Sequence, residues 1–159
     1  MHFTMLGDGR ACYVGSLFKE EKYFDVHLKG SGPTSYSRGG DGKATLASML
    51  KEYICSEALH GLNIPSTRSL AVCTSGESIW RETSHQGAVL ARIAQTHVRF
   101  GTFEYAQYFG NSLYTEKLLD FCIKHYYPRM HHHKQPCVAW FKSVAKRYID
   151  LMVDWLRVG

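Results

Sequence analysis

Two stretches near the start of the chain, residues 11–18 and 22–29, have the hydrophobic pattern of short β-strands. In the second stretch every other residue is apolar, namely Phe24, Val26 and Leu28. Because successive side chains of a strand point to opposite faces, we expect Lys29 on the face opposite these three residues. A short polar turn joins the two predicted strands.

A helical period follows at residues 43–60, where apolar side chains recur at intervals of three and four. The residues of this apolar stripe are Leu46, Met49, Leu50, Tyr53 and Ile54. Gly61, followed shortly by Pro65, supplies a stop signal. The pattern therefore predicts an amphipathic helix that ends near residue 60.

Three further stretches, 67–75, 77–82 and 87–96, are rich in β-branched and apolar residues. A Ser-Gly pair and a His-Gln-Gly sequence between them are turn signals, which predicts an antiparallel set of strands. From residue 102 the period becomes helical, and Pro136 stands where the first turn of the last helix tolerates proline. Strands followed by helices are typical of an α+β fold.

Composition changes this picture little. The chain has 159 residues, 45% of them apolar, which suits one core and a single domain. Its 19 Lys and Arg residues against 14 Asp and Glu residues give a net charge of +5. This balance suits a phosphate-bearing ligand but is equally common in proteins that bind none.

The cysteines and the apolar runs bear on the compartment. Five widely spaced cysteines indicate neither a disulfide framework nor a zinc site, so we expect a reducing compartment. The sequence has neither the pattern of a signal peptide nor an apolar run long enough to span a membrane. We therefore expect a cytoplasmic protein without a membrane partner.

A glycine-rich loop joins the strand that ends at Lys29 to the predicted helix. A phosphate group requires a fixed positive charge, backbone N–H groups that it can approach closely, and preferably the start of a helix. Lys29, the glycines at 30, 32, 39, 40 and 42, and the helix start near Lys43 can supply all three. The alternative is a long surface loop that contains glycine because it turns twice, and this stretch alone leaves both readings open. Its spacing matches neither the dinucleotide-binding fingerprint nor the P-loop.

The predicted helix offers two carboxylates, Glu52 and Glu57, as partners for Lys29. In kinase-like folds, a strand lysine that contacts phosphates is held by a glutamate on a helix. The helical wheel places Glu57 amid the apolar stripe and Glu52 well off it. A glutamate on the apolar side needs a partner or stays neutral, so Glu57 also qualifies as a counter-ion. Periodicity leaves the choice open.

Other polar groups allow similar alternatives. Asp8 lies between Gly7 and Gly9, and Arg10 follows, in a turn that either covers a nucleotide or is only solvated. Arg92 and Arg99 lie in an otherwise apolar segment and need anionic partners if buried, either phosphate or one of the two glutamates. The adjacent residues His131–His133 cannot all point at one metal ion, so we predict a surface turn and no metal site.

Several separated motifs, in order, resemble the selenoprotein O (SelO/YdiU) family of protein adenylyltransferases, which have a kinase-like fold. The motifs are GDGRA (7–11), LKGSGPTSYSRGGDGKA (28–44), EYICSEALHGLNIPSTRSL (52–70), GAVLARIAQTHVRFGTFEY (87–105) and DWLRVG (154–159). The resemblance implies a kinase-like N-lobe with an antiparallel sheet and a Glu-bearing helix at about residues 1–101, then the helical start of a second lobe at 102–159. It also implies that AMP passes from ATP to a Ser, Thr or Tyr hydroxyl of a protein substrate.

The same resemblance assigns site residues. Lys29 is expected to bind phosphate with Glu52, rather than Glu57, as its helix partner, and Arg92 and Arg99 are expected to hold phosphates. The residues implied to contact the nucleotide from two loops are Gly7, Gly9, Arg10, Asp41 and Gly42.

This sequence also departs from the family pattern. Ser35 stands where the family usually has proline, and Lys43 and Lys51 stand where it usually has arginine, which keeps the charge but loses the planar fork. Family members are several hundred residues long, and their Asp general base and their Asn and Asp ligands for Mg²⁺ (or Mn²⁺) follow the segment that resembles 154–159. We therefore expect an N-terminal-lobe fragment with no catalytic residue and no metal ligand, and little AMP transfer from it alone.

Two other classes of function remain open. The chain is alternatively a non-catalytic nucleotide-binding or regulatory module, or a degraded remnant. The last helix has apolar residues that would pack on the second lobe of the family, so we expect an exposed patch and self-association. These residues are Trp140, Phe141, Val144, Tyr148 and Trp155. Nucleic-acid binding is disfavoured because no basic stripe is interleaved with aromatic residues.

Overall fold

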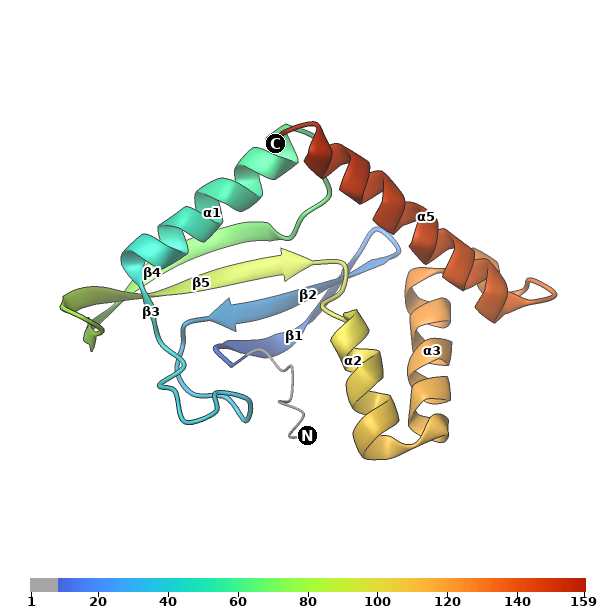
Figure 1. Cartoon of the computed structure of the whole chain (residues 1–159), viewed down its shortest axis with the longest axis horizontal. Coiled ribbons are helices and arrows are strands. Elements are labelled where there is room, and N and C mark those ends of the chain that lie inside the picture. The colour runs from blue at the N-terminus through green and yellow to red at the C-terminus, as the bar shows by residue number, and fades with distance from the viewer. Residues whose placement is uncertain (1–8) are drawn as a thin grey trace. The chain divides into compact units, whose positions relative to one another are not determined.

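The structure is a computed structural model that describes residues 9–159, and the chain divides into two units after His97. The first unit contains a five-stranded antiparallel sheet and helix α1, and the second, from Val98 to Gly159, is helical (Figure 1). The predicted α+β class is confirmed, and the first unit is compatible with a kinase-like N-lobe. The sequence pattern placed the change from strands to helices near residue 101.

The first two strands form a hairpin, as predicted. β1 (Ala11–Lys19) pairs antiparallel with β2 (Lys22–Lys29). The two turn residues, Glu20 and Glu21, have φ angles of 51° and 60°. Positive φ at both positions matches the twist of the flanking strands, which two-residue hairpin turns require.

β5 (Ser84–Ala94) is the central strand and pairs antiparallel with β2, with the short β3 (Ala44–Thr45) and with β4 (Arg68–Trp80). The prediction of separate strands at 67–75 and 77–82 is wrong, because one strand covers both. The register of β4 shifts between Thr74 and Ser78, and Gly76 there has a φ of 75°. A β-bulge therefore absorbs the Ser-Gly pair, and the His-Gln-Gly sequence lies inside β5.

Helix α1 (Leu46–Gly61) covers one face of the sheet above β4 and β5 (Figure 1). It begins three residues after the predicted start, because the Thr45 side chain caps it by accepting a hydrogen bond from the Ser48 N–H at 3.3 Å. The core of this unit consists of Ala44, Met49, Ala88 and Leu90. The predicted apolar stripe is wrong at Leu50 and Ile54, which are 43% and 64% exposed.

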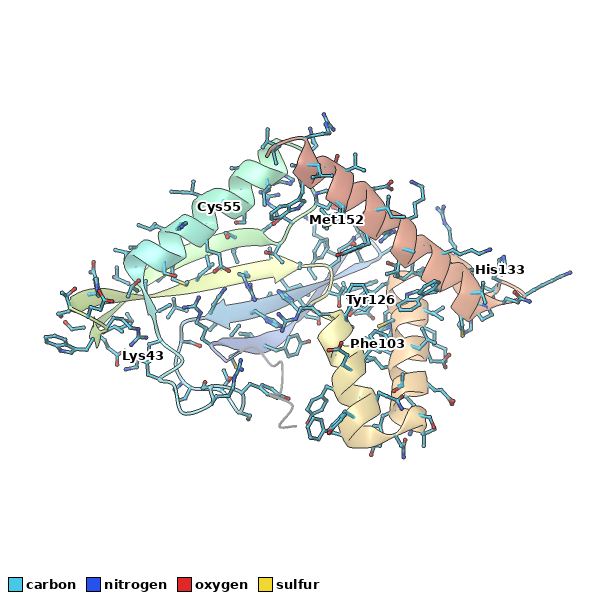
Figure 2. The ribbon with its side chains drawn as sticks, in the orientation of Figure 1. Lys43, Cys55, Phe103, Tyr126, His133 and Met152 are labelled. Atoms are coloured by element: carbon cyan, nitrogen blue, oxygen red, sulfur yellow. The ribbon has the colours of Figure 1, made fainter. Side chains whose placement is uncertain are left out.

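The second unit is a series of helices: α2 (Phe100–Tyr105), a π-helical turn (Ala106–Gly110), α3 (Ser112–Tyr126), α4 (Pro128–His131) and α5 (Pro136–Leu156). Pro136 opens α5, as predicted. Figure 2 shows Tyr126 on α3 and Met152 on α5.

Helix α5 exposes much of its apolar surface. Phe141, Tyr148 and Trp155 are more than half exposed, whereas Trp140 and Val144 are partly buried. Self-association through this surface stays a prediction. Across residues 9–159, none of the helices combines the length and the apolar character needed to span a membrane.

Candidate functional site

Three charged side chains meet between the sheet and α1: Lys29 at the end of β2, Glu52 on α1 and Arg92 on β5. Lys29 Nζ donates a hydrogen bond to Glu52 Oε2 at 2.6 Å, and Arg92 Nη1 donates to Glu52 Oε1 at 3.2 Å. The side chains of Lys29 and Arg92 are each 14% exposed, and that of Glu52 is 26% exposed. Lys29 and Arg92 bring two positive charges into a partly desolvated place, where they can attract an anion such as phosphate.

The strand register explains why these side chains meet. Lys29 pairs with Leu90 across β2 and β5, and directly paired residues point to the same face of a sheet. Arg92, two residues after Leu90, shares that face. Leu90 packs with Met49 of α1, so the helix covers this face, and Glu52 lies one turn beyond Met49 on the same side of the helix.

Glu57 has a different partner. Arg68 donates to both of its carboxylate oxygens, at 2.9 and 2.7 Å, and the Ser69 N–H donates at 3.0 Å. These hydrogen bonds, first from Arg68 and then from Ser69, lower the pKa of Glu57 to about 2. The helix carboxylate that contacts Lys29 is therefore Glu52, while Glu57 connects α1 to the start of β4.

The glycine-rich loop packs closely at both of its ends. Gly30 has a φ of 86°, and a Cβ there would lie 2.6 Å from the Ala44 Cβ and 2.8 Å from the Ala88 carbonyl oxygen. Gly42 has a φ of 63°, and its Cβ would overlap the carbonyl of Gly32. Only glycine tolerates both restraints. The Gly32 N–H donates to the Gly42 carbonyl at 3.3 Å, so the base of this loop is a defined structure.

Two ion pairs attach the same loop to the β4–β5 hairpin. Arg81 donates to both carboxylate oxygens of Asp41 at 2.9 Å, and Lys43 Nζ lies 3.0 Å from Glu77 Oε2. The hydrogen bond from Arg81, together with one from the Lys43 N–H, lowers the pKa of Asp41. Figure 2 labels Lys43 at the point where the loop enters β3.

The remaining predicted site residues lie in two places. The Gly30 N–H donates to the Arg10 carbonyl at 2.7 Å, and the Ser37 hydroxyl donates to the Gly9 carbonyl, so the turn before β1 lies against the glycine-rich loop. Gly7 lies outside the described residues. Arg99 belongs to the second unit, where it precedes α2 and its N–H donates to Thr102 Oγ1 at 3.1 Å. The binding of nucleotide by these residues stays a prediction.

Sequence reasoning missed two features of this region. One is Arg81, for which no local pattern gave a signal. The other is Asp25, which is 8% exposed and accepts hydrogen bonds from the Ser16 hydroxyl at 2.6 Å and the His97 N–H at 3.2 Å. The His97 ring stacks on that of His27 with centroids 3.6 Å apart. The strand alternation that predicted the face of Lys29 also places Asp25 and His27 on it, which was the available signal.

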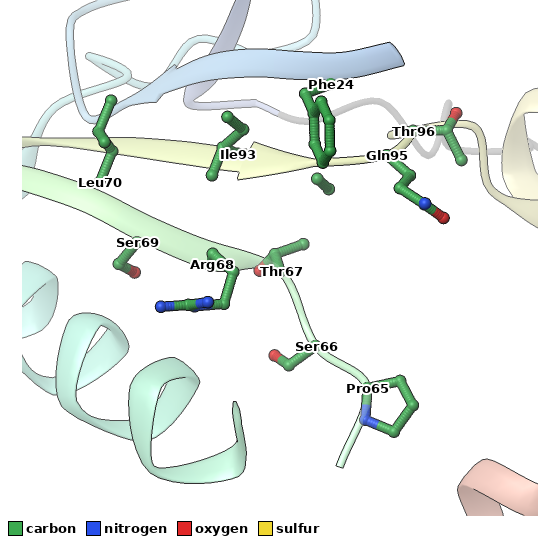
Figure 3. A pocket seen from close by; sticks show the side chains of 11 residues that line it. Phe24, Pro65, Ser66, Thr67, Arg68, Ser69, Leu70, Ile93, Gln95 and Thr96 are labelled. Atoms are coloured by element: carbon green, nitrogen blue, oxygen red, sulfur yellow. The ribbon is translucent and has the colours of Figure 1, made fainter. Parts of the chain in front are cut away.

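A cavity of about 670 Å³ lies elsewhere in the first unit (Figure 3). It is lined by Phe24 and Ile93 on the sheet and by Pro65 and the residues after it in the segment that leads into β4. Its charged side chain, Arg68, is engaged by Glu57. Because none of the predicted nucleotide-contacting residues lines it, the cavity is separate from the charged cluster around Glu52.

The described residues do not fit a metal site. Across residues 9–159 there is no group of three or more His, Cys, Asp and Glu side chains that could hold a metal ion. His131 ends α4, and His132 and His133 follow it as exposed residues. We therefore assign no reaction step to a metal ion held by these residues.

Comparison with known proteins identifies the same family that the sequence motifs resemble. A profile of the family described as "Protein adenylyltransferase SelO" matches residues 2–159. Relatives named "Protein nucleotidyltransferase YdiU" are 51% identical in Clostridium perfringens, 50% in Bacillus cereus and 49% in Shouchella clausii, each over 99% of this chain. These matches cover 32%, 33% and 33% of the relatives, so the chain spans about a third of their length.

Proposed function

This chain belongs to the protein adenylyltransferase SelO family, and on that premise we propose that its first unit binds the phosphates of ATP. The chain then supplies the ATP-binding portion of a protein nucleotidyltransferase that passes AMP to Ser, Thr or Tyr hydroxyls of protein substrates. The observation that carries the proposal is the cluster in which Lys29 and Arg92 both contact the carboxylate of Glu52.

Each member of this cluster has a distinct part. The Lys29 ammonium supplies a compact positive charge, and the planar guanidinium of Arg92 suits two oxygens of one phosphate group. Glu52 holds both cations in place and offsets part of their repulsion. The close backbone packing at Gly30 and Gly42 fixes both ends of the glycine-rich loop next to this cluster.

The proposed reaction makes specific demands on these groups. The acceptor oxygen attacks the α-phosphorus of ATP, the bond from that phosphorus to the bridging oxygen breaks, and pyrophosphate leaves with the electron pair. The proton of the acceptor hydroxyl passes to a base, which is not among the residues assigned here. Negative charge grows on the leaving pyrophosphate, and Lys29 and Arg92 are proposed to stabilise it.

The test is ATP binding to the unaltered chain, to Lys29→Ala and to Lys22→Ala, measured by isothermal titration calorimetry. Lys22 is a matched control because it lies on the same strand, is exposed, and alternates to the opposite face. Removing a charge-assisted hydrogen bond to phosphate is expected to weaken binding by about tenfold or more. We expect Lys22→Ala to bind ATP like the unaltered chain.

Two outcomes would contradict the proposal. Unchanged ATP affinity in Lys29→Ala would remove Lys29 from the site, and equal affinity for ATP and adenosine would mean that phosphates are not what the protein recognises. A transfer assay with ATP labelled in its α-phosphate then distinguishes a transferase from a non-catalytic nucleotide-binding module. For these 159 residues alone we expect binding with little transfer.

A further inference from the structure

Arg81, just after β4, connects parts of the chain that are far apart in sequence. Its guanidinium donates to Asp41 Oδ1 and Oδ2 at 2.9 Å, to the Lys43 carbonyl at 3.2 Å and to the Trp80 carbonyl at 2.8 Å. Asp41 is 40 residues away along the chain. One side chain therefore connects the β4–β5 hairpin to the turn that contains Asp41 and Gly42.

We propose that Arg81 is a positioning residue for the nucleotide site, which holds the Asp41–Gly42 turn where ATP can contact it. The inference rests on the proposed function, because it takes this turn to face the nucleotide. None of the sequence motifs and none of the family assignments above includes Arg81.

Arg81 holds the returning end of the loop at Asp41, directly before the base at Gly42. The base is fixed by the Gly32–Gly42 backbone hydrogen bond and by the close packing of Gly30 on Ala44. Beyond Gly32 the loop runs through several exposed residues before it returns at Asp41. If the turn also samples positions that cannot contact ATP, the apparent affinity falls in proportion to the fraction of molecules in which the turn is in the binding position.

Arg81 is also expected to favour ATP binding through its charge. Asp41 carries a negative charge that would repel the phosphates of ATP, and the bidentate pair with Arg81 offsets it. The Asp41 carboxylate also accepts the Lys43 N–H at 3.0 Å, so three of its roughly four acceptor positions are taken. Removing Arg81 would expose this charge and release the turn together.

The pair is a weak contributor to the stability of the fold. The side chains of Arg81 and Asp41 are 44% and 43% exposed, and solvent screens ion pairs at such exposure. Arg81→Ala should therefore leave the melting temperature nearly unchanged. This separates a positioning role in ligand binding from a structural role.

The experiment measures ATP affinity and melting temperature for the unaltered chain, Arg81→Ala, Arg81→Lys and Glu77→Gln. Glu77→Gln is a matched control because it breaks the Lys43–Glu77 ion pair between the same loop and hairpin without touching Asp41. We expect Arg81→Ala to bind ATP about tenfold more weakly, as when the competent fraction of the turn falls to a tenth. Arg81→Lys keeps the charge without the fork and should be intermediate, and Glu77→Gln should bind normally.

A double-mutant cycle with Asp41→Ala tests whether Arg81 acts through Asp41. In that background Arg81→Ala should cause no further loss of affinity, since its partner is already gone. Additive losses, or a fall in melting temperature that parallels the loss of binding, would overturn the positioning role. Normal ATP affinity in Arg81→Ala, combined with lost binding in Lys29→Ala, would overturn this inference alone. Failure of the unaltered chain to bind ATP would overturn both proposals.

Discussion

Two glutamates on the same helix have opposite surroundings. Glu52 and Glu57 lie five residues apart on α1, and their side chains are equally exposed, at 26%. Glu57 receives one cation, Arg68, and a backbone N–H, whereas Glu52 receives two cations, Lys29 and Arg92. The Glu57–Arg68 contact pairs one carboxylate with one guanidinium. Glu52 holds two cations at one place, and this difference separates a structural contact from a candidate anion site.

Of the changes to the two glutamates, Glu52→Gln should lower the free energy of unfolding more. It leaves Lys29 and Arg92, each 14% exposed, close together without their shared counter-ion. We expect the free energy of unfolding, measured in urea, to fall by about 2 kcal/mol, less than the ~3–5 kcal/mol for breaking a fully buried pair.

Adding inorganic phosphate to Glu52→Gln tests whether Lys29 and Arg92 can bind an anion. Added phosphate should restore part of the stability of Glu52→Gln, because Lys29 and Arg92 have both lost their contact with the Glu52 carboxylate and can bind the anion in its place. Glu57→Gln is the control and should gain nothing from phosphate. An equal gain in both variants would remove the distinction between the two glutamates.

Ser56→Ala tests the region between the two ion-pair clusters. The Ser56 and Ser69 hydroxyls are hydrogen-bonded at 2.7 Å, and both residues are buried. Losing this bond should lower the free energy of unfolding by about 1 kcal/mol, with ATP binding unchanged. The exposed Ser84 provides the control Ser84→Ala, and a loss of ATP affinity in Ser56→Ala would show that the clusters are not independent.

Glu57→Gln should have the smallest effect, and one that depends on pH. The folded state lowers the pKa of Glu57 from 4.5 to about 2, so its ion pair contributes fully above pH 4.5 and is lost as the pH falls toward 2. The stability difference between the unaltered chain and Glu57→Gln should therefore be small at neutral pH and shrink over this acid range. Urea unfolding at several pH values measures it, and a constant difference would contradict the assigned ion pair.

Local periodicity was sufficient to predict β1, β2 and most of α1, because these elements depend on contacts between near neighbours. It was insufficient for the orientation of α1. Five apolar positions defined a stripe, yet Leu50 and Ile54 are exposed while Ser56 is buried. The face that meets the sheet includes polar groups that pair across it, such as Ser56 with Ser69, and a hydrophobic pattern cannot register such pairs.

The partners of the charged side chains depend on contacts between residues far apart in the chain, which local patterns cannot predict. The chemistry of a strand lysine predicted a helix carboxylate, but periodicity left Glu52 and Glu57 open. The family resemblance favoured Glu52, and in the structure Lys29 donates a hydrogen bond to Glu52. Arg81 and Asp41 are 40 residues apart, and an arginine after a strand has no local signature of its partner. The run through Ser75 and Gly76 read as a turn, because a bulge and a turn use the same residues.

The packing of Gly42 against Gly32 has a consequence for how this loop can vary. The backbone hydrogen bond between these two glycines closes the loop at its base. Gly39 lies near the tip of the loop in open space, because a Cβ there would meet nothing within 4 Å, although its φ of 81° still favours glycine. Lengthening a loop whose ends are fixed costs little, since closure entropy grows only slowly with length. Insertions are thus tolerated at the tip, while the base of the loop admits no residue but glycine at position 42.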